Sequence, residues 1–212
     1  MTLVGGYFGV GLQEGDRHIV KYLVVSVVSL FIGTVMGVLQ VFPALHNWVV
    51  NTGQAGAWID PLAHTHINLV GGVTVGMMGL VYYALPRVLK RPLYSRRLAD
   101  ASFWFSLIGV YLFFFVLLAL GVAEGSYIGT HVPGIWGAAP VDGHTVNLLY
   151  YHAESRFYWL DELMVPGGIL MGLGYWGFIA NVLLSVYHRK ERMPAAPKRM
   201  VGMKETYDGS GG

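Results

Sequence analysis

The chain of 212 residues contains no cysteine and few charged residues. Without cysteine it has no disulfide, no thiolate site for zinc or an iron–sulfur cluster, and no covalent haem attachment. Only 12% of the residues are charged and 54% are hydrophobic, whereas about a quarter are charged in a soluble domain. The net charge of +2 comes from basic residues beside apolar runs, so no nucleic-acid partner is expected. This composition predicts a membrane protein.

Four apolar stretches are long enough to cross a hydrocarbon core, which takes about 20 residues of helix. They are 22–45, 67–85, 101–123 and 163–187. We predict an all-α membrane protein with a four-helix transmembrane domain over 1–190. The charged stretch ahead of the first run lacks a cleavable-signal pattern, so we expect the first span to be retained. Pro194, Pro197 and the glycine-rich end predict a flexible or partner-bound tail over 191–212.

Basic residues gather in the connection after the second span and in the segment after the fourth. They are Arg87, Lys90, Arg91, Arg96 and Arg97 in the first, and Arg189, Lys190, Arg192, Lys198 and Arg199, beside His188, in the second. The positive-inside rule therefore places both termini on the cytoplasmic side, in a bacterial or archaeal cytoplasmic membrane. The long connection 124–162 then lies outside, and its Gly, Pro, Tyr and His content indicates an ordered lid or docking surface.

Six of the eight histidines fall on the outer side in this topology: His46, His64, His66, His131, His144 and His152. Imidazole in or beside a bilayer is costly unless it pairs or binds something, so His64 and His66, which open the second span, are candidate ligands of a metal or a haem iron. On a regular helix they project about 200° apart, so one iron takes only one of them. An extended backbone at 64–66 would let both hold a single ion.

A six-coordinate low-spin haem b needs a second axial ligand, most simply another histidine. His152 is our preferred candidate, because aromatic residues surround it in the sequence and Arg156 can neutralise a haem propionate. Arg156 has an alternative role in an ion pair with a nearby carboxylate. His144 and a histidine of another subunit are the alternative ligands. A calcium or proton site is a weaker interpretation of the acidic residues of this region, Glu124, Glu154, Asp161 and Glu162.

Glycines recur at close spacing in the second and fourth spans. They are Gly71, Gly72, Gly76 and Gly79 in one, and Gly167, Gly168, Gly172, Gly174 and Gly177 in the other. Such spacing lets helices, or a flat macrocycle, approach closely. Helix packing alone is the simpler interpretation, but the two histidines ahead of the second span also favour a haem there.

Three segments together resemble a known family. The sequence His-Thr-His-Ile-Asn-Leu-Val-Gly-Gly at 64–72, followed by Gly-Leu-Val-Tyr-Tyr-Ala-Leu-Pro at 79–86, is similar to helix two of the catalytic subunit of haem–copper oxidases, above all the cbb3-type oxidases and nitric oxide reductases. The sequence Ala-Leu-Gly-Val-Ala-Glu-Gly at 119–125 resembles the end of helix three. The resemblance implies that helix two supplies a low-spin haem b ligand. Alignment on His-Thr favours His64, and alignment on His-x-Asn favours His66.

The family's remaining metal ligands lie in later helices, for which this sequence has no room. The resemblance therefore implies a truncated relative without a catalytic centre, a cytochrome b-like electron-transfer subunit of a hetero-oligomeric respiratory complex. Its electrons would come from a quinol or a c-type cytochrome. Two alternatives remain open: a non-haem anchor subunit, and a quinol-oxidising subunit that uses His66, Tyr82 or Tyr151.

Overall fold

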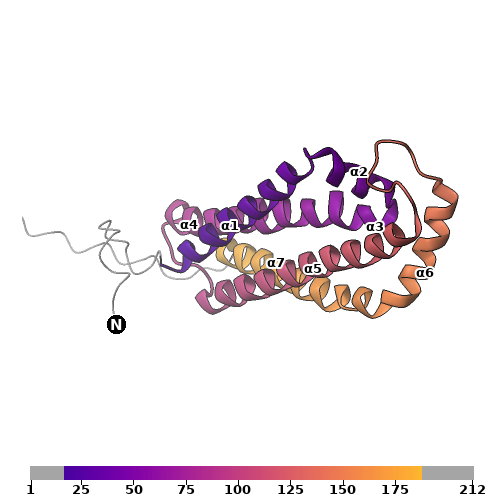
Figure 1. Ribbon diagram of the computed structural model, residues 1–212. Coiled ribbons are helices and arrows are strands. Elements are labelled where there is room, and N and C mark those ends of the chain that lie inside the picture. Colours follow the sequence, from indigo (N-terminus) through magenta and orange to yellow (C-terminus); the bar gives the residue numbers. More distant parts are fainter. Residues whose placement is uncertain (1–16, 188–212) are drawn as a thin grey trace, which may run out of the picture.

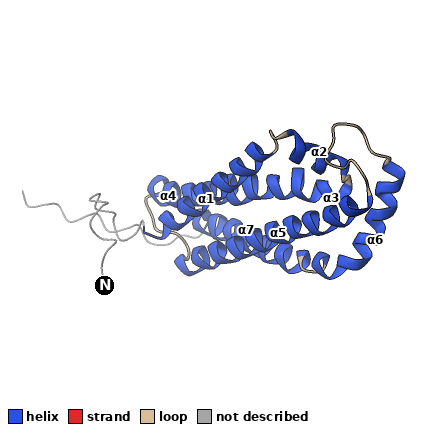
Figure 2. Ribbon diagram, viewed as in Figure 1, coloured by secondary structure: helices blue, strands red, loops and turns tan. Residues whose placement is uncertain are grey.

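The computed structural model describes residues 17–187, and these residues form helices joined by short connections (Figures 1 and 2). The elements are α1 (Arg17–Leu39), α2 (Pro43–Asn51), α3 (Gln54–Ala57), η2 (Trp58–Ala63), η3 (His66–Thr74), α4 (Val75–Leu89), α5 (Arg96–His131), α6 (Gly143–Asp161) and α7 (Met164–Tyr187). The elements η2 and η3 are wide π-helical turns. The predicted all-α fold is confirmed for this part of the chain. The predicted tail over 191–212 lies outside it.

Within residues 17–187, four helices are long and apolar enough to cross a membrane: His18–Leu39, Gln54–Leu89, Arg96–His131 and Met164–Tyr187. The protein is therefore an integral membrane protein, as the composition predicts. The first helix ends at Leu39 rather than near residue 45, because Pro43 begins a separate helix and Phe42 before it has an extended backbone. The second and third helices are longer than the predicted spans, at 36 residues each.

The segment 124–162, predicted as a loop, is mostly helical. Helix α5 continues to His131 and α6 begins at Gly143, which leaves 132–142 as the connection. Asp142 starts α6 by accepting hydrogen bonds from the backbone N–H groups of His144 (3.2 Å) and Thr145 (3.1 Å). Hydrogen bonds from Thr145 also hold the pKa of Asp142 below its usual value. Both prolines of this segment, Pro133 and Pro140, lie in the 132–142 connection, with two of its five glycines.

The helices form an elongated bundle whose two ends differ (Figure 1). The start of α1, the end of α4 and the end of α7 lie at one end, while α2, α3 and α6 lie at the other. Along the bundle α5 packs against α7, and η3 and α4 pack against α1. The basic connection between α4 and α5 thus shares an end with the start of α1. Which of the two ends faces the cytoplasm stays a prediction.

Most of the glycines serve helix contacts. A Cβ atom on Gly71, Gly72, Gly76 or Gly79 would come within 2.6–2.9 Å of a side chain of α1. On α7, a Cβ atom on Gly174 or Gly177 would come within 2.2–2.7 Å of a serine of α5. Gly168 and Gly172 instead have no atom within 4 Å of an added Cβ. These contacts support the helix-packing interpretation of the second-span glycines.

A buried amide ties the connection before α5 to α7. Asn181 is fully buried, accepts a hydrogen bond from the backbone N–H of Ser95 (3.1 Å) and donates to the carbonyl oxygen of Ser95 (2.9 Å). It also donates to the hydroxyl of Tyr82 at 3.3 Å. Backbone groups that are freed by a helix end inside an apolar medium need such partners. Asn181 therefore fixes the turn between the second and third spans.

Candidate haem-ligand site

His64 lies where the second span is irregular. Asp60 has an extended backbone (φ −136°, ψ 116°) inside the wide turns of η2, and it precedes Pro61. One turn later, Nδ1 of His64 lies 3.2 Å from Oδ1 of Asp60. Because a carboxylate only accepts hydrogen bonds, Nδ1 is the donor and carries the proton. The lone pair of Nε2 is then available to bind a metal.

Two features lie beside the ring of His64, a pocket and a glycine of α1. A pocket of about 220 Å³ is lined by His64, Thr65, Asn68 and Leu69. Gly37 of α1 contributes no side chain beside the ring, and a Cβ there would lie 3.5 Å from Nε2. Thr65 and Leu69 are exposed, so this pocket opens on the outside of the described helices. His64 thus combines a fixed tautomer with a pocket beside its side chain and a glycine next to its Nε2.

His66 faces a different neighbour. Its Nδ1 lies 2.8 Å from the carbonyl oxygen of Leu62, which also makes Nδ1 the donor. Its ring packs against Phe113 of α5, with 4.8 Å between the ring centroids. His64 (φ −57°, ψ −47°) and Thr65 (φ −65°, ψ −44°) have helical backbones. The two imidazoles diverge as a helix requires, and the alternative of an extended chelating backbone is wrong.

The candidates on α6 are exposed. His144, His152 and Arg156 all lie on its exposed surface, and α6 packs against α3, α5 and α7. The backbone carbonyl of His152 accepts a hydrogen bond from Ser155 (2.8 Å). None of α3, α5 and α7 contains His64, so the role of His152 or His144 as a second ligand stays a prediction.

Among residues 17–187, no group of three or more His, Asp or Glu side chains is placed to hold a metal ion. The calcium interpretation of the outer carboxylates therefore gains no support. Glu124 is instead buried, with 2% of its surface exposed, and accepts a hydrogen bond from Nε1 of Trp58 at 2.9 Å. Tyr82, one candidate for quinol chemistry, is fully buried against Asn181.

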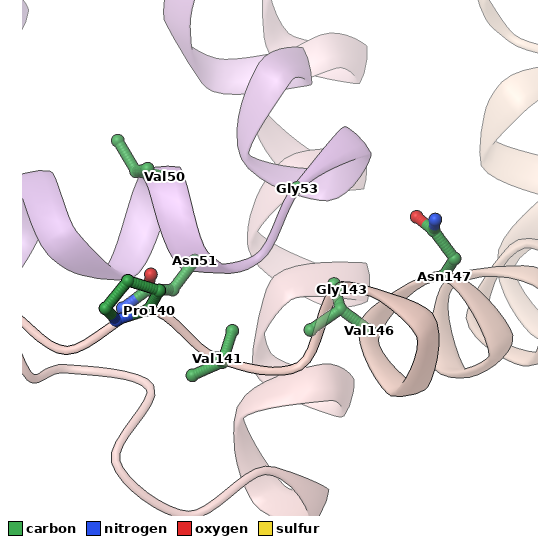
Figure 3. A pocket seen from close by; sticks show the side chains of 8 residues that line it. All are labelled: Val50, Asn51, Gly53, Pro140, Val141, Gly143, Val146 and Asn147. Carbon is green, nitrogen blue, oxygen red and sulfur yellow. The ribbon is translucent and has the colours of Figure 1, made fainter.

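A second pocket of about 190 Å³ lies between the end of α2 and the start of α6 (Figure 3). Its lining contains no ionisable side chain and consists of Val50, Asn51, Gly53, Pro140, Val141, Gly143, Val146 and Asn147. The Asn51 amide donates to the carbonyl oxygens of Ile135 and Gly137, both at 3.0 Å. This pocket contains none of the residues that the sequence singles out. The side-chain amide of Asn51 holds the 132–142 connection in place.

Sequence reasoning missed Asp60 and Gly37. Asp60 stands four residues before His64, a spacing at which side chains on a helix meet, so the spacing was a usable indication. Gly37 lies on another helix, and nothing local in the sequence indicates its position opposite His64.

Residues 15–170 match the family described as cytochrome c and quinol oxidase polypeptide I. The chain belongs to this family, the haem–copper oxidase subunit I family that the sequence resembles. A relative is the cbb3-type cytochrome c oxidase subunit CcoN1 of Stutzerimonas stutzeri, with 26% identity over 203 residues. The match covers 92% of this chain and 36% of that relative. No solved structure matches the chain.

Proposed function

We propose that this chain binds a low-spin haem b through His64 and acts as an electron-transfer subunit of a membrane redox complex. The observation that carries the proposal is the imidazole of His64, whose Nδ1 donates to Asp60 and whose Nε2 lies beside Gly37, where α1 has no side chain, while a pocket adjoins the same residue. Neutral imidazole with its other nitrogen hydrogen-bonded is the form in which histidine binds metals in proteins. Membership in the oxidase family favours haem over a bare ion.

The residues present fit one face of such a group. His64 would supply a nitrogen ligand, and its buried apolar neighbours in the chain, Ala63 and Ile67, would lower the local dielectric constant. When bound, the haem supplies one-electron redox chemistry. His66 is the alternative ligand, because its Nδ1 also carries the proton. The pocket beside His64 favours His64, whereas the ring of His66 is packed against Phe113.

The second axial ligand is proposed to be His152, with Arg156 as the partner of a propionate. His144 and a histidine of another chain are the alternatives. A ligand from another chain is supported by the pocket's opening on the outside of the described helices, which leaves room for a further segment. The name of the CcoN1 relative supports a complex with other membrane redox subunits. A c-type cytochrome or a quinol is proposed as the electron donor.

A reduced-minus-oxidised absorbance spectrum of the full chain, purified in its membrane complex, tests the proposal. We expect a b-type alpha band in the wild type. His64→Ala should lose haem, and His66→Ala should keep it with a shifted potential, because the two rings face different helices. Equal retention in both variants rules out ligation from this segment. A wild type without the band, in haem-replete preparations, favours the non-haem anchor.

A further inference from the structure

The contact between Asp60 and His64 has a feature that the contact of His66 lacks. The acceptor of the His64 Nδ1–H is a carboxylate at 3.2 Å, whereas the acceptor of the His66 Nδ1–H is the backbone carbonyl of Leu62 at 2.8 Å. The side chains of His64 and Asp60 are 28% and 34% exposed, so water screens this contact less than one at an open surface. The two imidazoles therefore differ in the charge of the group that holds them.

The backbone explains why Asp60 reaches His64. Asp60 leaves the helical conformation at φ −136° and ψ 116°, while His64, four residues on, is helical. The carboxylate thus stands at the break of the second span, one turn before the ring. The side chain of Asp60 is short, so it has few conformations to lose when it forms this contact.

We propose that Asp60 is a positioning residue for the haem ligand: it fixes the orientation of His64 and lowers the reduction potential of the iron that His64 binds. This inference rests on the proposed function. A carboxylate that accepts from Nδ1–H makes Nε2 a stronger electron donor, and such partners tune the metal as well as orient the ligand. A stronger donor and a nearby negative charge both favour the ferric over the ferrous state. A neutral acceptor in the place of the Asp60 carboxylate stabilises the ferric state less, so the reduction potential is higher.

The test is a spectroelectrochemical titration of Asp60→Asn in the full chain within its membrane complex. Asn keeps the size and the acceptor oxygen of Asp but removes the charge. We expect haem to be retained and the ratio of reduced to oxidised haem at a fixed potential to rise about tenfold, which is a shift of about 59 mV for one electron. A purely structural role for Asp60 would weaken the fold and leave the potential of the bound haem unchanged.

Glu162→Gln is the matched control, because Glu162 is an exposed carboxylate at the turn between α6 and α7. It should keep the wild-type potential. If Asp60→Asn and Glu162→Gln both keep that potential and the wild-type haem content, the role of Asp60 is refuted while haem binding stands. If the wild type itself holds no haem, the proposed function fails and the role of Asp60 falls with it.

Asp60→Ser replaces Asp60→Asn if the latter does not fold, and the same rise of the potential is expected. Haem loss from a variant that keeps its helical circular dichroism and its elution volume supports the role, because removal of such a partner weakens metal binding about 10- to 100-fold. An unchanged potential in a folded Asp60→Ser overturns it.

Discussion

A Cβ atom on Gly37 of α1 would lie 3.5 Å from Nε2 of His64 in the second span. One turn earlier on α1, a Cβ on Gly33 would overlap the amide of Asn68, at 2.1 Å from its Oδ1. Gly33 and Gly37 therefore face Asn68 and His64, and α1 places no side chain from these positions against the ring. Access to Nε2 depends on the missing side chain at Gly37.

Gly37→Ala should weaken haem binding while the fold is kept. A methyl group 3.5 Å from Nε2 is in ordinary contact with the empty ring, but it occupies space on the metal-binding side. Overpacking of this kind costs about 1–3 kcal/mol, which corresponds to roughly a 5- to 150-fold weaker affinity. Haem titration followed by absorbance measures the effect.

Gly168→Ala is the control for this substitution. It makes the same change in a membrane helix where an added Cβ has no atom within 4 Å, and it should bind haem as the wild type does. Wild-type affinity in Gly37→Ala as well would contradict a haem on this side of His64.

The spans and the family follow from the sequence because both depend on local patterns. The length of an apolar run is set by the membrane thickness, and the divergence of His64 and His66 follows from the helical period. The motif of 64–72 and 79–86 likewise lies within one helix. These features need no knowledge of what packs against them.

Features set by long-range contacts could not be predicted. An apolar window ends at Glu124, but α5 continues to His131, and the Glu124 carboxylate is buried and accepts a hydrogen bond from Trp58. Hydropathy also gives no indication of α6, since its sequence is not apolar enough to be a candidate membrane span. The position of Gly37 opposite His64 depends on how α1 crosses the second span.

His152→Ala should convert a six-coordinate low-spin haem into a high-spin one if His152 is the second ligand, since the iron then loses one axial nitrogen. The absorbance and electron paramagnetic resonance spectra report the spin state. His46→Ala, at an exposed histidine of α2, is the control and should stay low-spin. An unchanged spectrum in His152→Ala would direct the search to His144, to His131 or to a neighbouring chain.

Asn181→Leu should destabilise the bundle. It removes the acceptor of the partly buried backbone N–H of Ser95 and one of the two donors to the Ser95 carbonyl, which keeps the N–H of Ala99. An unsatisfied buried polar group costs about 1–3 kcal/mol, so thermal unfolding in detergent should begin at a lower temperature. Asn147→Leu, at an exposed amide of α6, is the matched change and should have little effect. Equal unfolding temperatures of Asn181→Leu and Asn147→Leu would show that Asn181 does not fix the turn.

Tyr150 should be the tyrosine of α6 that titrates late. Burial, with the negative charges of Glu124 and Glu154, raises its pKa to about 12, whereas an unfolded tyrosine titrates near 10. The folded state therefore keeps the phenol proton more tightly, and this contribution to stability is complete below about pH 10 and is lost as the pH rises through about 12. The tyrosinate absorbance of the wild type minus that of Tyr150→Phe should show one transition near pH 12, which moves to about 10 in denaturant. A folded-state midpoint near 10 would show that the ring is solvated.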